Sequence, residues 1–202
     1  MRIEIVVFDG FDELDAIGPF EVLRNAAHAV DDLEVELVGA DGGGVVTASH
    51  GLRVTVDRGL TREADLVIVP GGGWNDRAPA GARAEAERGE LPARLAELHA
   101  HGAHVASVCT GAMVLAAAGL TAGRPATTHK GALDDLRASG AEVIDARVVD
   151  DGDLVTAGGV TSGLDLALHL VEREWGATLA EAIAGEMELE RDRRVWTRAP
   201  TA

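Results

Sequence analysis

One cysteine in this chain lies at a junction suited to nucleophilic chemistry. Cys109 directly follows the apolar run 103–108, and Thr110, Gly111 and an Ala-rich helical segment follow it. This pattern is typical of a nucleophile elbow, in which one residue between a buried strand and a helix projects at the carboxyl end of the sheet. The N–H groups at the start of that helix carry partial positive charge, so we expect them to favour the thiolate. A lone cysteine is more often a small buried apolar residue, but the elbow spacing predicts a reactive one.

A glycine-rich loop, Pro70-Gly71-Gly72-Gly73, follows a second apolar run at residues 66–69. Because the carboxyl ends of parallel strands meet at one edge of a sheet, we expect this loop to lie near Cys109. Together with the N–H of Thr110, a loop N–H could stabilise a developing negative charge, as an oxyanion hole does. A glycine triplet alone is more often a flexible turn, and no Gly-Lys-Ser/Thr follows, which excludes a phosphate-binding loop.

Two further side chains are candidates for proton transfer. Asp15 follows the strand predicted at residues 3–8 and precedes a helix predicted to begin at Pro19, so we expect it in a loop near the elbow. There a carboxyl can share a proton with the sulfur, and its pKa rises. In a chain with 34 Asp and Glu residues, the alternative is an ordinary surface acid. His129 could be a base or an orienting group, or simply a structural histidine.

The elements that must position these residues alternate along the chain. Short apolar runs separated by longer segments of helical period predict an α/β domain with a largely parallel sheet of about six strands. The predicted strands are at 3–8, 34–38, 66–69, 103–108 and 126–128, the hairpins at 45–56 and 146–157, and the helices at 19–29, 85–101, 109–119, 132–138, 161–175 and 179–189. No linker or repeat interrupts them, so we expect a single domain over residues 1–202.

Composition excludes several classes of function. The chain has 18 Lys and Arg against 34 Asp and Glu, a formal net charge of −16, and its basic residues form no stripe, which argues against nucleic acid as a partner. One cysteine excludes an intrachain disulfide, and the seven histidines show no H-E-x-x-H spacing, so no metal is expected. The N-terminus has no leader-peptide pattern and no apolar run approaches ~20 residues. These features predict a cytoplasmic protein without a membrane partner.

An ordered series of short motifs resembles the ThiJ/PfpI family of the class I glutamine amidotransferase-like superfamily. In chain order the motifs are Leu14-Asp15-x-x-Gly18-Pro19, Val69-Pro70-Gly71-Gly72-Gly73, Val108-Cys109-Thr110-Gly111-Ala112, Ala118-Gly119-Leu120, Thr127-Thr128-His129 and Gly158-Gly159-Val160-Thr161-Ser162-Gly163. Each is weak alone, but their order and spacing cover nearly the whole chain. The chain is most similar to the branch that contains isocyanide hydratases and the sensor domains of AraC-type regulators.

The resemblance implies a flavodoxin-like three-layer sandwich, usually a homodimer, that acts on a small molecule without a cofactor. In isocyanide hydratases a thiolate adds to the isocyanide carbon, an acid moves a proton, and water releases an N-substituted formamide. Carried over to this chain, Cys109 is the nucleophile, Asp15 shuttles the proton, Thr110 places water or charge, and Gly72 lends its N–H. Asp192, in Leu189-Glu190-Arg191-Asp192, is a candidate accessory residue of the site, and its match to the family covers only this short stretch.

Two departures from the family pattern limit what the resemblance implies about substrate and activity. Lys130-Gly131-Ala132 follows His129 where the branch usually has an aromatic residue, so the substrate is not carried over. PfpI-type proteases have a histidine directly after the cysteine, where this chain has Thr110, which argues against protease activity.

Two alternative functions fit the same motifs. One is a non-catalytic or redox-sensing regulatory domain related to AraC-type sensors, and the other is a glyoxalase-like activity. The few residues between the last predicted helix and residue 202 leave no room for two helix-turn-helix units, which favours the free-standing enzyme.

The expected homodimer would bury a leftover aliphatic surface. We expect that surface on the first predicted helix, at Phe20, Val22 and Leu23, and around residues 158–163, with the active site near the interface. The alternative is that these residues pack inside their own domain.

Overall fold

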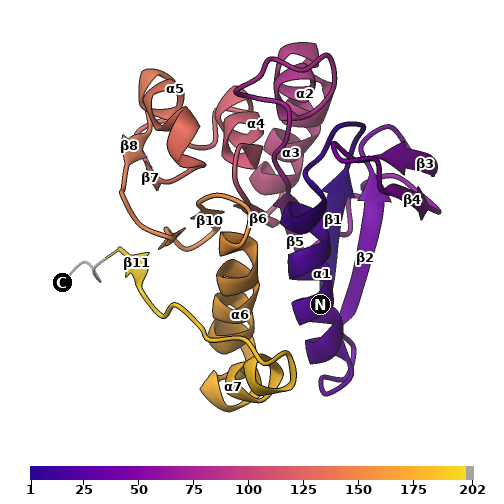
Figure 1. The fold of residues 1–202 in the computed structure, drawn as a ribbon, viewed down its shortest axis with the longest axis vertical. Helices are drawn as coiled ribbons and strands as arrows, with labels where there is room; N and C mark the ends of the chain where they lie inside the picture. The colour runs from indigo at the N-terminus through magenta and orange to yellow at the C-terminus, as the bar shows by residue number, and fades with distance from the viewer. Residues whose placement is uncertain (199–202) are drawn as a thin grey trace.

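A seven-stranded sheet runs through the middle of the molecule (Figure 1). The computed structural model describes residues 1–198, and its strand order is β11-β9-β10-β6-β5-β1-β2. Neighbouring strands pair in parallel except in the β9–β10 hairpin, which confirms the predicted mostly parallel sheet. The strands are β1 (Arg2–Val7), β2 (Glu34–Gly39), β5 (Leu66–Val69), β6 (His104–Ser107), β9 (Val148–Asp150), β10 (Leu154–Ala157) and β11 (Val195–Thr197).

Helices cover both faces of this sheet and complete the predicted flavodoxin-like sandwich. One group consists of α1 (Glu13–Ala27), α6 (Ser162–Trp175) and α7 (Ala177–Glu186), which pack against one another. The other consists of α2 (Ala82–Arg88), α3 (Glu90–Ala100) and α4 (Gly111–Ala117). All four residues of β5 are buried, as expected of a central parallel strand covered on both faces.

Two small sheets extend from this sandwich. β3 (Gly44–Thr47) and β4 (Arg53–Val56) form the antiparallel hairpin that the sequence predicted. β7 (Pro125–Ala126) pairs with β8 (Glu142–Val143), and this pair lies beside the 3-10 helix η1 (Lys130–Ala132) and α5 (Leu133–Ala138). The short segment between β7 and η1 carries His129, so this small unit positions one of the candidate site residues.

The first helix begins earlier than its sequence predicted, and this changes the setting of Asp15. α1 starts at Glu13 because the Asp12 side chain caps it, accepting a hydrogen bond from the Leu14 N–H at 3.2 Å. Pro19 therefore lies inside the helix, where it only removes the bond to the carbonyl of Asp15. Asp15 is thus held in the first turn of a helix, and the prediction that it lies in a loop is wrong.

Two other features differ from the prediction. The single helix predicted at 85–101 is two helices, because Gly89 adopts φ +81°, a left-handed conformation that ends α2 and precedes α3. β8 and β11 were not predicted, since they are two and three residues long and depend on pairing with distant strands. The single domain expected over 1–202 includes residues 199–202, which lie outside the described residues.

The aliphatic residues of the first helix do not form a free surface. Val22 and Leu23 are fully buried in the core, and Phe20 packs against it, so the expectation of a leftover patch at these positions is wrong. The predicted helix periodicity already allowed this outcome, since an apolar stripe serves a core as well as an interface.

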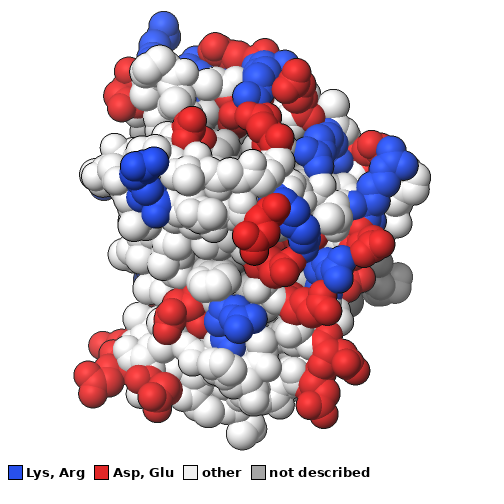
Figure 2. Space-filling model, turned by 90° about the vertical axis from the view of Figure 1, so that its right-hand side faces the viewer, with Lys and Arg blue, Asp and Glu red and all other residues white. Residues whose placement is uncertain are grey.

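The surface carries acidic and basic groups side by side. Viewed from the side of β2 and the β3–β4 hairpin, red and blue groups adjoin one another (Figure 2). Ion pairs between exposed or half-buried side chains include Arg2–Glu34, Arg88–Asp41 and Arg62–Glu97. Among residues 1–198, no helix combines the length and the apolar character needed to cross a membrane.

Candidate active site at Cys109

Cys109 forms the predicted elbow between β6 and α4. Its φ of +55° lies in the left-handed region, which a side chain rarely adopts unless neighbouring contacts enforce it. The Cys109 N–H donates to the carbonyls of Ala157 (3.1 Å) and Gly158 (2.8 Å), and its own carbonyl accepts from the Thr128 hydroxyl at 2.8 Å. These three hydrogen bonds connect the elbow to the end of β10 and to the segment between β7 and η1. They stabilise the left-handed backbone conformation of Cys109.

Glycine at two positions lets the β5 loop approach the elbow. A Cβ at Gly71 would lie 2.5 Å from the Thr110 nitrogen and 3.0 Å from Asp15 Oδ2. A Cβ at Gly111 would overlap the carbonyl of Val69. The expectation that the glycine loop lies beside Cys109 is therefore confirmed, and the glycines serve close backbone packing.

Asp15 is fully buried next to this loop, and half of its carboxyl group has no partner. Oδ2 accepts the Gly71 N–H at 2.9 Å, whereas Oδ1 has no hydrogen-bond partner within residues 1–198. Burial, together with the negative charge of Asp12, raises the pKa of Asp15 to about 7, although the Gly71 N–H and a hydrogen bond with Cys109 oppose the shift. Near neutral pH this carboxyl can therefore both accept and release a proton.

The Cys109 thiol does not have the low pKa that the helix N-terminus suggested. Burial and the negative charge of Asp15 raise the pKa of Cys109 to about 12, while the N–H groups of Thr110 and Val160 act in the opposite direction. α4 has only seven residues, and its first N–H groups do not offset the loss of water around a sulfur that lies beside a carboxylate. The thiol and the carboxyl therefore titrate as a pair, with the proton on sulfur whenever Asp15 is ionised.

Of the two backbone donors expected near the sulfur, Thr110 acts on the thiol but Gly72 does not. The Gly72 N–H donates to the Thr110 hydroxyl at 3.0 Å, and the N–H groups that favour the thiolate are those of Thr110 and Val160. Val160 has φ +41°, which is strained for a β-branched residue. Val160 stands in the motif at residues 158–163, but the sequence analysis assigned it no role.

His129 is oriented by a residue that sequence reasoning missed. Its Nδ1 accepts the Gly131 N–H at 3.1 Å and lies 3.3 Å from the amide nitrogen of Asn75. In the neutral ring these donors place the hydrogen on Nε2. The ring lies against Gly159, where a Cβ would be 2.6 Å from His129 Cδ2. Asn75 follows the glycine loop closely in sequence, but nothing in the chain linked it to a histidine 54 residues away.

A pocket of about 470 Å³ adjoins the elbow and brings His129 and Asp192 together. Its lining residues are Thr127, Thr128, His129, Lys130, Leu133, Asp145, Ala146, Arg147, Gly158, Gly159, Val160, Ser162, Asp192 and Arg194. Cys109 is not in this lining, but Thr128, Gly158 and Val160 contact it through backbone or hydroxyl groups.

Asp192 is engaged by Arg194 in the wall of this pocket. Oδ1 accepts from Arg194 Nε at 3.0 Å, and Oδ2 accepts from Arg194 Nη2 at 2.6 Å. These hydrogen bonds hold the pKa of Asp192 well below its usual range. Within the described part of the chain, no three His, Cys, Asp or Glu side chains are grouped to hold a metal ion.

Comparisons with known proteins agree with this geometry. Residues 1–173 match the model of the DJ-1/PfpI family. The isonitrile (isocyanide) hydratase of Pseudomonas putida is 35% identical over 190 residues, covering 93% of this chain and 78% of that protein. A deglycase of Pyrococcus abyssi is 33% identical over 161 residues, covering 78% of this chain and 89% of that protein.

Among solved structures, a ThiJ/PfpI family protein from Pseudomonas syringae superposes with a TM-score of 0.83 at 30% identity, covering 96% of this chain and 76% of that one. Relatives at this similarity include named enzymes, and the family match spans most of the chain. The resemblance predicted from the short motifs is confirmed, and the chain belongs to the DJ-1/PfpI family.

Proposed function

We propose that this chain is a cysteine-dependent hydratase that converts a small electrophile, such as an isocyanide, to an N-substituted formamide. The observation that carries the proposal is the pairing of Cys109 with Asp15, a buried carboxyl whose pKa of about 7 and unpartnered Oδ1 suit a proton shuttle. General acid-base groups work best when their pKa lies near the working pH.

The first step joins sulfur to the substrate carbon. Asp15, as carboxylate, takes the thiol proton while the Cys109 sulfur attacks the terminal isocyanide carbon, and the C–S bond forms. The Asp15 carboxyl then delivers that proton to the same carbon, which yields a thioimidate with a C=N bond. The high thiol pKa requires this coupling, because free thiolate is scarce until Asp15 accepts the proton.

Water completes the reaction. A water molecule adds to the thioimidate carbon, and one of its protons passes through Asp15 to the substrate nitrogen. The C–S bond then breaks as the hydroxyl of the adduct becomes the formamide carbonyl, and its proton passes through Asp15 to the leaving sulfur. The products are the N-substituted formamide and the resting thiol with Asp15 ionised. The N–H groups of Thr110 and Val160 stabilise negative charge on sulfur as it leaves, and the Thr110 hydroxyl positions the water while it holds the Gly72 N–H.

The test is a turnover screen with purified protein on isocyanides, methylglyoxal and small amides, using wild type, Cys109→Ala and Asp15→Asn. We expect formamide from an isocyanide only with wild type, and none with Cys109→Ala. Hydration that persists in Cys109→Ala would contradict the covalent mechanism. Cys109 is the only cysteine, so no other thiol can replace it.

A second candidate activity has support from the relatives. The Pyrococcus abyssi protein that is 33% identical is named a deglycase, and a glyoxalase-like reaction would use the same thiol and carboxyl. Turnover of methylglyoxal without turnover of isocyanides would favour this activity. No turnover in any arm, together with oxidation of Cys109 by peroxide, would favour the redox-sensing alternative.

We also propose that the chain works as a cytoplasmic homodimer. A catalytic thiol without a disulfide partner suits a reducing compartment. Val45 and Leu52 of the β3–β4 region are 51% and 45% exposed, and a second subunit would cover them. Sedimentation at micromolar concentration tests the dimer, since a single species near 20.9 kDa would refute it.

A further inference from the structure

The chain contains a single lysine, Lys130, and that lysine lies in the wall of the pocket beside the elbow. All other basic side chains except the histidines are arginines. Lys130 directly follows His129 and begins η1, and the His129 ring caps this helix by accepting the N–H of its second residue, Gly131. The position of Lys130 is therefore fixed by the same turn that orients His129.

The other two cations of the pocket wall are already neutralised. Arg147 pairs with the buried carboxylate of Asp165, and Arg194 pairs with Asp192. Lys130, by contrast, has no ion pair within residues 1–198 and is exposed. In a chain with nearly two acids for every basic residue, an unpaired ammonium in this pocket wall is opposite in sign to the net charge of the chain.

His129 adds a second donor next to this ammonium. Its Nδ1 is occupied by the Gly131 N–H and by Asn75, so the neutral ring carries its hydrogen on Nε2. No acceptor for Nε2 is found in the described part of the chain. Two adjacent residues thus offer donors, one of them charged, and a carboxylate is the ordinary partner for such a pair.

One unpaired acid also lines the pocket, at the other end. Asp145 lies with Ala146, Arg147 and Arg194 where the pocket meets a neighbouring hollow lined by Val195 and Trp196. Thr128, Gly158 and Val160, which contact Cys109, line the same pocket as His129 and Lys130. Lys130 is therefore the cation of this pocket wall that no carboxylate pairs within residues 1–198.

We propose that Lys130, together with the Nε2–H of His129, binds a carboxylate on the substrate, so that this site accepts anionic electrophiles such as an α-isocyano acid. This inference rests on the proposed function for the reaction itself, but carboxylate recognition can be measured without turnover. The Lys130 ammonium attracts the substrate carboxylate by its charge, and the His129 N–H orients that carboxylate through a hydrogen bond. The reactive carbon, at the other end of the same small molecule, is then attacked by Cys109.

The first test compares alkylation of Cys109 by iodoacetate and by iodoacetamide. In both reactions the sulfur displaces iodide and a C–S bond replaces the C–I bond, but only iodoacetate carries a carboxylate. We expect Lys130→Gln to lower the iodoacetate-to-iodoacetamide rate ratio about fivefold at low salt. Using the ratio removes any change in the thiol pKa, because such a change affects both reagents alike.

Two further variants control for net charge and for folding. Arg62→Gln removes one positive charge from an exposed side chain that pairs with Glu97, and it should keep the wild-type ratio. Lys130→Arg should retain most of the wild-type ratio, since the charge remains. The difference between wild type and Lys130→Gln should shrink as salt is raised. Equal ratios in wild type and Lys130→Gln would overturn the proposal.

The second test uses isocyanoacetate and its methyl ester as substrates. For wild type we expect a lower KM with isocyanoacetate, and for Lys130→Gln a KM for isocyanoacetate that rises about fivefold toward that of the ester. If neither compound is turned over while the alkylation ratio still depends on Lys130, the hydratase proposal fails and the anion site stands. If the ester is preferred and the ratio is unchanged, the anion site fails alone.

Discussion

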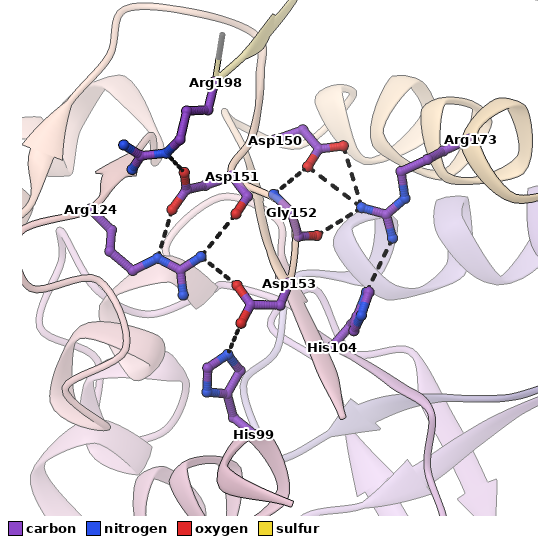
Figure 3. Close-up of polar contacts among 9 residues, drawn as sticks. All are labelled: His99, His104, Arg124, Asp150, Asp151, Gly152, Asp153, Arg173 and Arg198. Atoms are coloured by element: carbon purple, nitrogen blue, oxygen red, sulfur yellow. Dashed lines mark hydrogen bonds and ion pairs between the residues drawn. The ribbon is translucent and has the colours of Figure 1, made fainter. Parts of the chain in front are cut away.

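Asp15 lies at the carboxyl end of the central sheet, whereas Asp150, the last residue of β9, and Asp151 and Asp153, in the turn before β10, lie at the amino end (Figure 3). Asp15 is fully buried and has one backbone partner, the Gly71 N–H. Asp150 is also buried, but it accepts from the Gly152 N–H (2.7 Å), His169 Nε2 (2.7 Å) and Arg173 Nη1 (3.3 Å).

The neighbours of Asp150 in this turn are held in the same way. Arg124 contacts both Asp151 (2.6 Å) and Asp153 (2.5 Å), Arg198 contacts Asp151 at 2.5 Å, and His99 Nε2 lies 3.0 Å from Asp153. Burial alone would raise the pKa of these three carboxyls, but the bonds to arginine and histidine outweigh it and hold each pKa below its ordinary value.

The difference shows that the hydrogen-bond and ion-pair partners of a buried carboxyl, more than burial itself, determine the direction of its pKa shift. At the amino end every aspartate meets at least one cation, so the charge is stabilised and the turn is tied to α3, to α6 and to Arg198, the residue after β11. At the carboxyl end Asp15 faces another acid and a thiol, and its pKa rises to about 7. One cluster stabilises the fold, and the other is available for proton transfer.

The largest expected effect comes from removing the titratable group at the carboxyl end. Asp15→Asn should lower kcat/KM on the substrate identified by the screen by about 10³-fold, since an amide cannot take up and return the proton. The wild-type kcat/KM should rise with pH through about 7, as the carboxylate forms, and the variant should lose this rise. Asp31→Asn, at an exposed position, is the matched control. A loss of less than tenfold would show that another group moves the proton.

Next in size is the loss of charge at the amino end. Asp150→Asn should lower the free energy of unfolding at pH 7 by about 2 kcal/mol, because His169 and Arg173 lose their charged partner. Its kcat/KM per folded molecule should stay within about twofold of wild type, since Asp150 lies at the far end of the sheet. Urea unfolding measures the first effect, with Asp134→Asn as an exposed control. Equal stability of wild type and variant would contradict the claim that the paired aspartates at the amino end stabilise the fold.

The two ends should also respond to pH in opposite directions. Asp150 has a lowered pKa in the fold, so its stabilisation is present above the unfolded pKa and is lost as pH falls through the folded value. Asp15 has a raised pKa, so its contribution is present below the unfolded value of 3.8 and is lost as pH rises through about 7. The stability of Asp15→Asn relative to wild type should therefore increase by about 4 kcal/mol between pH 4 and pH 8. Urea titrations at pH 4, 6 and 8 test the slope, and a difference independent of pH would contradict the raised pKa.

The smallest effect should come from removing an exposed arginine that contacts the aspartates at the amino end. Arg198→Ala removes one partner of Asp151, but Arg198 is 55% exposed and Arg124 remains paired with the same carboxylate. We expect a loss of only about 0.5 kcal/mol in the free energy of unfolding. A loss as large as that of Asp150→Asn would mean that the contact with β11 is a main support of the turn. Thermal unfolding of the two variants side by side makes the distinction.

The sequence by itself determined the elements whose signals are local. Apolar runs such as 66–69 predicted buried parallel strands, and the step from strand to helix around Cys109 predicted the elbow, because each depends on adjacent residues. The ordered motifs were enough to indicate the family. The helix start at Glu13 could have been found from the Asp12 cap, but Pro19 was the more conspicuous signal.

Only the tertiary structure decided the chemistry of the site. It placed Asp15 beside Cys109, set the Val160 N–H toward the sulfur, and put Asn75 against His129, all across long separations in sequence. It also reversed the expected thiol pKa, because the desolvation of a buried sulfur and the charge of a neighbouring carboxylate depend on what surrounds them in space. The same residue type, Asp, is a paired anion at position 150 and a buried carboxyl with a raised pKa at position 15, since only the fold determines which of them meets a cation.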